Sequence, residues 1–246
     1  MRSIFKCAVS LLLTVTVQSA WAGNFTVGVE AIDYLPIYKG EGSQYSGFSR
    51  ELLDAFAAKY GHQFSYKAFP VARLFDEFIK GGLDFKFPDN PQWSSDAKKG
   101  KNISYSKGAV EVVEGLMVLP ENKGKGIATI RKLATMRGFT AWPYLDAINK
   151  KTIELTESNS FEALIQMGIN KRADGIYIST IVGNFYLNEV MKKQGALVLD
   201  SSLPNTQSSF SLSSQNHPEV IAQFNEFLGK EKAAIAKLKA KYKIEE

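Results

Sequence analysis

Residues 69–106 of the chain read FPVARLFDEFIKGGLDFKFPDNPQWSSDAKKGKNISYS, a pattern that predicts a helix, a glycine turn, a buried strand and a polar loop. Pro70 suits the first position of the helix, where no amide hydrogen is needed, and apolar residues follow it with helical spacing. Two consecutive glycines then end the helix. Phe85 and Phe87 alternate with polar residues as in a strand, and this strand ends at Pro88 and the residues after it, where α/β proteins tend to place their binding sites.

Strands and helices alternate on both sides of this stretch, which predicts an α/β protein with largely parallel sheets. Residues 34–42 form a loop that is rich in aromatic residues and glycines. Ser49 can cap the helix that follows, and Gly61 closes it. Residues 120–126, PENKGKG, break the pattern and mark the edge of a second lobe. The further expected strands are 25–30, 63–69, 110–119, 136–140, 153–156, 197–200 and 210–213, and the further expected helices are 144–151, 181–190 and 218–242.

The second lobe repeats the order found in residues 75–87, FDEFIKGGLDFKF. Residues 161–178, FEALIQMGINKRADGIYI, again predict an amphipathic helix, a polar turn, an aspartate and a buried strand. Asp84 and Asp174 fall at matching points, one residue before the apolar part of each strand. Two interpretations stay open: an internal repeat, or the general similarity of helix-to-strand turns.

The first 22 residues have the composition of a secretory signal peptide. Arg2 and Lys6 supply a basic start, an apolar run of moderate length follows, and the small-x-small residues 20–22 suit a cleavage site. The apolar run is too short to span a bilayer, and no second run of that kind follows. We expect the exported chain to begin near Gly23 and to be soluble.

Composition and charge argue against several classes of function. Cys7 lies in the predicted leader, so the exported chain holds no disulfide and depends on its core for stability. The formal net charge is +5 at pH 7, or +3 without Arg2 and Lys6 of the leader, and the basic residues are scattered, which gives no support for nucleic-acid binding. His62 and His217 are the only histidines, and no acidic cluster has the spacing of metal ligands, so we expect no metal and no cofactor.

Five motifs, taken in chain order, carry a family resemblance. They are GFSREL at 47–52, FPVAR at 69–73, GGLDF at 81–85, an aromatic strand end at 103–106 and RADGIY at 172–177. In this order and spacing they resemble the bacterial extracellular solute-binding proteins of family three, which include periplasmic polar-amino-acid receptors of ABC importers. The first motif departs from the family by having a serine where an acid is usual, and FPVAR looks like a subgroup with Pro-x-x-Arg. The resemblance covers nearly the whole exported chain.

This resemblance implies a type II periplasmic-binding-protein-like fold, with two α/β lobes joined by crossing hinge strands that close on a ligand. The first lobe would comprise residues 23–119 and 205–246, and the second lobe residues 120–204. The resemblance further implies a monomer in the periplasm that binds a small polar ligand, amino-acid-like or another small carboxylate or charged metabolite, for an ABC permease. A sensory adaptor that reports to a membrane sensor would have the same sequence pattern.

The residues that usually hold an α-amino acid in this family are incomplete in this chain. Counting back from the aromatic strand end places Lys99 where an arginine usually binds the carboxylate, and lysine lacks the bidentate fork. Counting on from Asp174 places the neutral Ser179 where an aspartate usually binds the amino group. Because an unpaired buried ammonium is costly, a standard zwitterionic amino acid is disfavoured.

We expect the ligand to contact residues at the facing edges of the two lobes. Arg73 begins a helix near the carboxyl edge of the sheet, where it could meet a carboxylate, a phosphate or a ring, and the alternative is a surface cation. Trp93 and Trp142 are favoured because each sits near a proline in a polar loop. For the other aromatics, packing in the core or hinge is the alternative. The expected ligand contacts are Tyr34, Arg73, Trp93, Lys99, Thr140, Trp142, Tyr144 and Ser179.

Catalysis is a further class of function, because a few proteins of this fold are enzymes, including a periplasmic dehydratase of aromatic precursors. Asp33, Asp89 or Asp96 could supply a cleft carboxylate with a raised pKa. Nothing in the sequence pairs with any of them, and no nucleophilic triad or phosphate loop is recognisable. We therefore expect a binding protein and not an enzyme.

Overall fold

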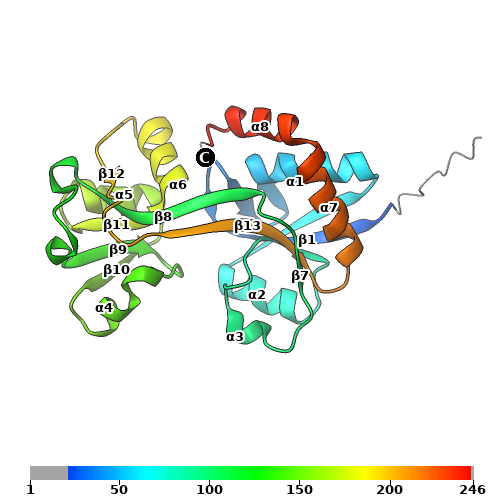
Figure 1. Cartoon of the computed structure of the whole chain (residues 1–246), viewed down its shortest axis with the longest axis horizontal. Helices are drawn as coiled ribbons and strands as arrows, with labels where there is room; N and C mark the ends of the chain where they lie inside the picture. The colour runs from blue at the N-terminus through cyan, green and yellow to red at the C-terminus, as the bar shows by residue number, and fades with distance from the viewer. Residues whose placement is uncertain (1–21, 245–246) are drawn as a thin grey trace, which may run out of the picture.

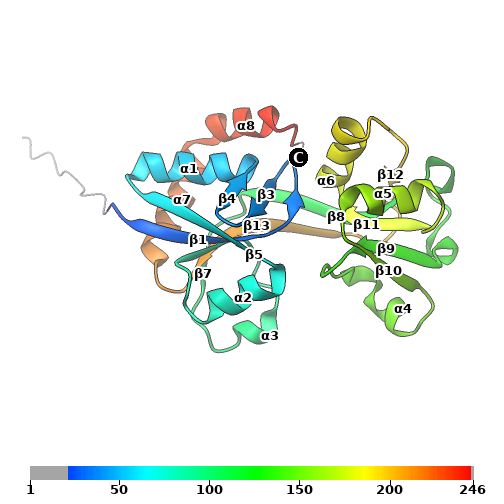
Figure 2. The same ribbon diagram turned by 180° about the vertical axis from the view of Figure 1, so that it is seen from behind.

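The computed structural model describes residues 22–244, so all but the last residue of the predicted leader lies outside the described residues. Two groups of strands and helices lie side by side, and two long strands, β8 (Val110–Val118) and β13 (Thr206–Ser214), run between them (Figures 1 and 2). None of the helices in the described range has both the length and the apolar character of a membrane span.

One large sheet passes through both groups, with the strand order β10-β9-β11-β8-β13-β6-β1-β5. β8 and β13 pair with each other as antiparallel strands, and each also pairs with a strand on its other side. They therefore connect the two groups through backbone hydrogen bonds. We call the elements on the β1 side of this pair the first lobe and the elements on the β9 side the second lobe.

In the first lobe, β1 lies between β5 and β6 and runs parallel to both. Helices α1, α7 and α8 lie on one side of these strands, and α2 and α3 lie on the other (Figure 1). The elements are β1 (Asn24–Glu30), β2 (Asp33–Tyr34), β3 (Tyr38–Glu41), β4 (Gln44–Ser46), α1 (Phe48–Tyr60), β5 (Gln63–Phe69), α2 (Val71–Ile79), β6 (Phe85–Asp89), α3 (Ser95–Lys98), β7 (Ser104–Tyr105), α7 (Pro218–Lys230) and α8 (Lys232–Lys241).

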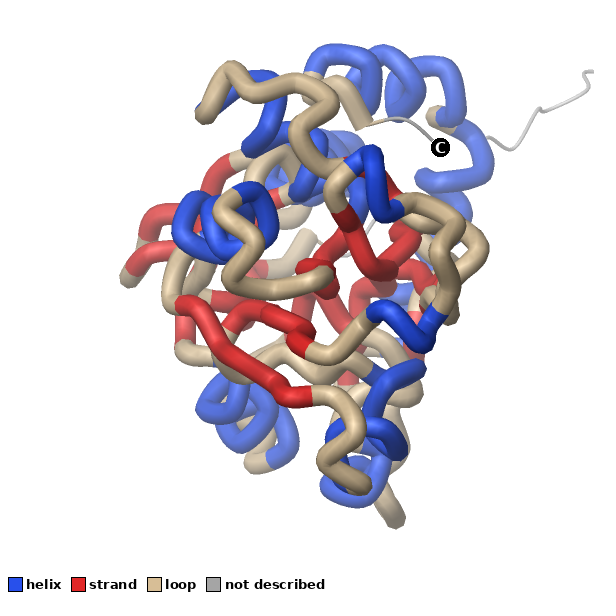
Figure 3. Tube along the Cα trace, turned by 90° about the vertical axis from the view of Figure 1, so that its left-hand side faces the viewer, coloured by secondary structure: helices blue, strands red, loops and turns tan. Residues whose placement is uncertain are grey.

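In the second lobe, β9 lies between β10 and β11 and runs parallel to both. Seen end-on from this lobe, the strands occupy the middle, with helices above and below them (Figure 3). The elements are η1 (Pro120–Asn122), η2 (Ile127–Thr129), β9 (Lys132–Met136), η3 (Trp142–Tyr144), α4 (Leu145–Asn149), β10 (Glu154–Ser158), α5 (Phe161–Ile169), β11 (Gly175–Ser179), α6 (Thr180–Phe185), η4 (Tyr186–Val190) and β12 (Val198–Leu199).

Asp84 and Asp174 make the same kind of contact in the two lobes. Oδ2 of Asp84 accepts a hydrogen bond of 2.7 Å from the amide of Thr26, near the start of β1. Oδ2 of Asp174 accepts hydrogen bonds of 2.8 Å from the amides of Arg131 and Lys132, at the start of β9. Each carboxylate ties its own strand to the central strand of its lobe, which supports the internal repeat over a chance similarity of turns.

The structure corrects three predicted elements of the first lobe. Residues 34–42 are not a plain loop, because they belong to a small antiparallel sheet of β2, β3 and β4. Ser49 lies inside α1 instead of capping it, and the helix begins after Gly47, whose φ of 93° is in the left-handed region that favours glycine. The predicted helix 218–242 is divided at Glu231 into α7 and α8.

One strand of the second lobe is also corrected. A strand was expected at 136–140, but β9 ends at Met136 and the chain turns at Gly138, which has a φ of 84°. Residues 137–140 are thereby free to form a loop at the carboxyl end of β9. The helix-turn-strand pattern of residues 161–178 is confirmed as α5 and β11.

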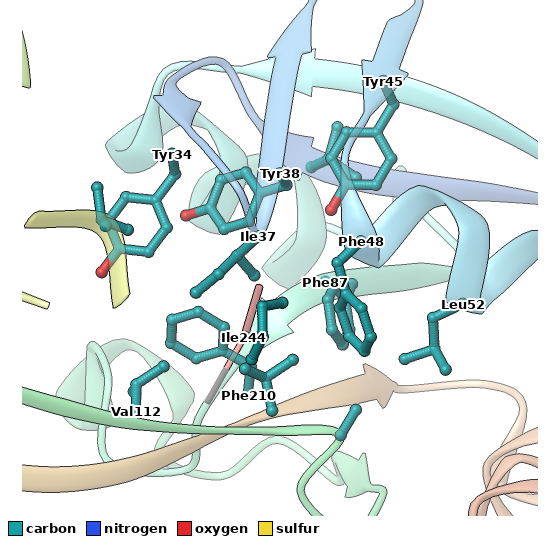
Figure 4. Close-up of a cluster of buried hydrophobic side chains, with 14 of the residues drawn as sticks. Tyr34, Ile37, Tyr38, Tyr45, Phe48, Leu52, Phe87, Val112, Phe210 and Ile244 are labelled. Carbon is teal, nitrogen blue, oxygen red and sulfur yellow. The ribbon is translucent and has the colours of Figure 1, made fainter. Parts of the chain in front are cut away.

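The aromatic core of the first lobe extends to the strands that connect the lobes (Figure 4). Tyr34 and Tyr38 are almost completely buried, and their rings stack with centroids 5.1 Å apart. Phe210 from β13 lies 6.2 Å from the Tyr34 ring, and Val112 from β8 belongs to the same cluster. The connecting strands are therefore held by side-chain packing as well as by backbone hydrogen bonds.

Candidate functional site between the lobes

A cavity of about 290 Å³ lies between the two lobes, at the small end of the range for ligand sites. The first lobe, the second lobe and both connecting strands all contribute to its wall. The lining residues are Glu30, Tyr34, Tyr38, Val71, Ala72, Phe75, Trp93, Ser94, Glu114, Gly138, Phe139, Thr140, Trp142, Tyr177 and Phe210.

The first-lobe wall is formed by the start of α2 and the loop after β6. Phe75 of α2 and Trp93 of the loop both face the cavity. The Trp93 ring packs edge-on against Phe210 with centroids 5.5 Å apart. Behind these two rings, Nζ of Lys86 lies 4.2 Å from the Phe75 ring centroid and 5.4 Å from that of Trp93. This cation helps to hold both rings in place.

Lys86 belongs to a buried ionic cluster at the end of β6. Its Nζ donates to Oδ1 of Asp89 at 3.2 Å and to the carbonyl of Pro88 at 2.6 Å. Lys98 donates to the same Asp89 oxygen at 2.9 Å, and Ser213 donates to the other Asp89 oxygen at 2.6 Å. Lys86 lies between Phe85 and Phe87 in the strand, and like them it is fully buried. Its partners compensate for the loss of water, so the cluster fixes the strand end that leads to Trp93.

The second-lobe wall is the loop that follows β9. Gly138, Phe139, Thr140 and Trp142 line the cavity from this loop, and Trp142 is 51% exposed. Backbone hydrogen bonds hold the loop, for example from the amide of Phe139 to the carbonyl of Met136 at 3.0 Å. These four lining residues carry no charge, so the second-lobe wall is neutral where this loop forms it.

Tyr34 joins the two walls at one end of the cavity. Its ring lies 5.9 Å from Phe139 and 5.6 Å from Phe161, both of which belong to the second lobe. Close to this contact, the hydroxyl of Tyr186 donates to the carbonyl of Asp33 at 3.0 Å. The small sheet of the first lobe therefore contacts α5 and η4 of the second lobe directly.

Two carboxyl groups line the cavity, Glu30 at the end of β1 and Glu114 in the middle of β8. Glu30 accepts a hydrogen bond from the hydroxyl of Tyr38, and Glu114 accepts one of 3.4 Å from that of Tyr34. Burial raises the pKa of Glu30 above its ordinary value, although Lys86 and Tyr38 act in the opposite direction. Burial also raises the pKa of Glu114, to about 7, with a smaller contribution from the negative charge of Glu30.

Four of the predicted contact residues line the cavity together: Tyr34, Trp93, Thr140 and Trp142. They come from three separate segments of the chain. Their contact with a ligand stays a prediction, but the structure places them around one space.

The other four predicted residues lie outside the cavity lining. Arg73 is exposed and its Nε lies 3.5 Å from Glu77, while Lys99 is 79% exposed and pairs with Asp96 at 2.6 Å. Tyr144 is buried in the core of the second lobe, where its hydroxyl donates to the carbonyl of Pro204 at 2.7 Å. Ser179 is buried at the end of β11.

The sequence-based prediction missed the two acids and most of the other rings. A signal for Glu30 was present, since it is a charged residue at the carboxyl end of an apolar strand, where α/β proteins bind ligands. Glu114 interrupts the apolar strand VEVVEGLMV, an unusual place for a carboxylate. The carboxylates considered for catalysis lie elsewhere: Asp89 is inside the ionic cluster, and neither Asp33 nor Asp96 lines the cavity.

Within residues 22–244, no group of three histidine, cysteine, aspartate or glutamate side chains is arranged to hold a metal ion. The chemical groups available in the cavity are therefore carboxyl groups, hydroxyl groups and aromatic rings.

Two lobes joined by a pair of crossing strands, with a cavity between them, define the two-lobed binding-protein fold. No protein-family model and no curated protein sequence matches the chain. Solved structures match most of it. The ancestral amino acid-binding protein AncCDT-1, a precursor of cyclohexadienyl dehydratase, is 20% identical with a TM-score of 0.67, over 89% of this chain and 95% of that one.

Two further structures are similar to the same extent. An arginine 3rd transport system periplasmic binding protein from Legionella pneumophila is 13% identical with a TM-score of 0.67, over 90% of this chain and 100% of its own. The substrate binding protein of an amino acid ABC transporter is 19% identical with a TM-score of 0.66, over 89% and 99%. The predicted fold class is confirmed, and the structural neighbours are amino acid-binding proteins of the kind that the sequence motifs resemble.

Proposed function

We propose that the protein is a solute-binding protein that traps one small molecule between its two lobes. The observation that carries this proposal is that both lobes and both connecting strands line a single cavity. Bending of β8 and β13 would change the distance between the lobes, and a ligand that contacts both walls would favour the closed arrangement. The proposed ligand contacts are Tyr34, Trp93, Thr140 and Trp142, together with Glu30 and Glu114.

The proposed setting is the periplasm, reached through the predicted leader. There the protein would act as a monomer and deliver its ligand to an ABC permease. The structural similarity to a periplasmic binding protein of a transport system supports this setting. The same closing motion would also suit a protein that reports ligand binding to a membrane sensor. Co-purification from cross-linked membranes of the native cells would separate the two, since it would recover either a permease or a sensor.

Small-angle scattering combined with ligand recovery tests the binding proposal. A compound that raises the melting temperature should also reduce the radius of gyration, and it should be recovered chemically unchanged after incubation. Binding without any decrease in the radius of gyration would contradict lobe closure. Consumption of the compound would contradict a pure binding role.

An enzyme on the same fold is the second candidate, and one observation favours it. The carboxyl group of Glu114 faces the cavity, and its pKa of about 7 suits a general acid or base at neutral pH. One structurally similar protein is described as a precursor of a dehydratase. If the protein is such an enzyme, Glu114→Gln should abolish product formation while the bound compound persists. The binding proposal predicts no product from either form.

A further inference from the structure

The charges that line the cavity are all of one sign. Glu30 and Glu114 face it, while no lysine, arginine or histidine is among its lining residues. Within residues 22–244 neither carboxylate forms a direct ion pair, although the positive charge of Lys86 acts on Glu30 and opposes the rise in its pKa. Their hydrogen-bond partners are the hydroxyls of Tyr38 and Tyr34. An ionised carboxylate that is partly withdrawn from water without a cation beside it is unfavourable, and Glu114 has no such cation among the described residues. A positively charged ligand would supply one.

Aromatic rings make up most of the rest of the wall. Eight of the fifteen lining residues are aromatic, and they come from both lobes and from β13. Ring faces attract cations, and tryptophan does so most strongly. Trp93 and Trp142 lie on opposite walls, and the Trp142 side chain is half exposed, so part of its surface is free to contact a ligand. A wall of this kind suits a positively charged group with an apolar body.

Among the described residues, no cation lines the cavity where it could pair with a ligand carboxylate. Arg73 lies outside the lining and pairs with Glu77, and Lys99 is exposed beside Asp96. Lys86 lies behind the rings of the first-lobe wall, with its donors directed to Asp89 and to a backbone carbonyl. An anionic group in this cavity would therefore meet two carboxylates and no cation.

The cluster behind the wall does not cancel the charge of the cavity. Lys86 and Lys98 supply two positive charges, and Asp89, Glu30 and Glu114 supply three negative charges when all are ionised. One negative charge is left over. The positive charge of a ligand would balance it.

We infer that the ligand is a small organic cation without a carboxylate, an amine or a quaternary ammonium compound, whose charged group lies between Glu30 and Glu114 against the rings of the wall. Its apolar part extends between Trp93 and Trp142. This inference rests on the proposed binding function and narrows it, because amino acids with a free carboxylate are placed outside the ligand class.

The test uses pairs of compounds that differ by one carboxylate. The pairs are 2-phenylethylamine and phenylalanine, agmatine and arginine, and choline and glycine betaine, with 3-phenylpropionate as an anion. Binding is measured by thermal shift and calorimetry at pH 8. The inference predicts that at least one of the three cations binds, and that its carboxylated partner binds at least tenfold more weakly.

The outcomes separate the ligand class from the function. If a zwitterion or the anion binds as tightly as the matched cation or more tightly, the ligand class is wrong and the receptor function stands. The ligand class is equally wrong if no cation binds while native mass spectrometry of the purified protein releases an anion or a zwitterion. If no compound of any charge binds and the purified protein releases none, the receptor function is contradicted as well.

Two matched variants of β8 test whether the charge of Glu114 is required for binding a cation. Glu114→Gln keeps the size of the side chain and removes its charge, so it should weaken the binding of the tightest cation at least tenfold. Glu111→Gln is the control, because Glu111 lies on the same strand, is exposed and does not line the cavity. It should change the affinity less than twofold. Equal effects of the two variants, or no effect of Glu114→Gln on a folded protein, would overturn the assigned role of Glu114.

Discussion

The two walls of the cavity are built in different ways. The first-lobe wall rests on a buried ionic cluster, in which Lys86 and Lys98 share Asp89 and support the rings of Phe75 and Trp93. The second-lobe wall is a short loop after β9 that carries the half-exposed Trp142. This difference suggests that the first-lobe wall is the more rigid one and would position a ligand. The second-lobe wall would adapt to the ligand as the lobes close.

The largest effect is expected from removing the carboxylate at the centre of the ionic cluster. Asp89→Asn leaves Lys86 and Lys98 buried without the carboxylate that both of them contact, and removing one member of a buried ion pair costs about 3–5 kcal/mol of unfolding free energy. Urea unfolding at pH 7 measures this loss. Asp96→Asn is the control, because Asp96 forms only an exposed pair with Lys99 and should change stability by less than about 0.5 kcal/mol. Similar losses in the two variants would contradict the role given to the cluster.

The two tryptophans offer a second test of the difference between the walls. Trp93→Ala removes a ring packed on Phe210 and should lower the unfolding free energy by about 2 kcal/mol as well as weaken ligand binding. Trp142→Ala removes a half-exposed ring and should change stability by less than about 1 kcal/mol, while it weakens binding to a similar degree. Calorimetry and urea unfolding of both variants provide the comparison. A larger loss of stability from Trp142→Ala would reverse the assignment of the rigid wall.

Glu114, on the strand between the two walls, makes the stability of the folded protein depend on pH. Its pKa of about 7 in the folded protein lies above the ordinary value of 4.5, so the unfolded chain loses this proton at a lower pH than the folded protein does. The stability contributed by this group is therefore complete below about pH 4.5 and is lost as the pH rises towards 7.

Glutamine cannot ionise, so Glu114→Gln should make the ligand-free protein more stable at pH 8 by on the order of 1–2 kcal/mol, since the side chain is only partly buried. The gain should nearly vanish at pH 4.5. Thermal unfolding at the two pH values checks this result, with Glu111→Gln as the control that shows no gain. A Glu114→Gln protein that is less stable than the parent protein at pH 8 would contradict the raised pKa.

The local pattern of the sequence was enough to predict much of the fold. The helix-turn-strand order of residues 161–178 and the matching positions of Asp84 and Asp174 depend on neighbours in the chain, and these predictions agree with the structure. Alternation along a strand does not reveal that Lys86 is buried, because that pattern is typical of a strand with one face in water. Here the carboxylate of Asp89 and the rings of the wall take the place of water.

The site was less predictable because it depends on contacts between distant segments. Tyr34 meets Phe161 across the two lobes, and nothing near either residue in the sequence indicates this contact. The position of Glu114 in the cavity follows from the crossing of β8 between the lobes, which the apolar pattern of that strand does not reveal. The sequence pointed to loop residues such as Trp93 and Trp142, which line the cavity, but not to the two acids on strands that line it as well.

The smallest expected effect concerns Arg73, which the sequence had placed among the ligand contacts. Its neighbours Val71 and Ala72 line the cavity, but the guanidinium lies 3.5 Å from Glu77 and is largely exposed. Exposed pairs of this kind contribute less than about 1 kcal/mol, so Arg73→Ala should leave stability nearly unchanged and alter ligand affinity by less than about threefold. Calorimetry with the tightest ligand measures this change. A loss of binding would mean that α2 moves Arg73 into the cavity when the lobes close, and the first-lobe wall would then be the adaptable one.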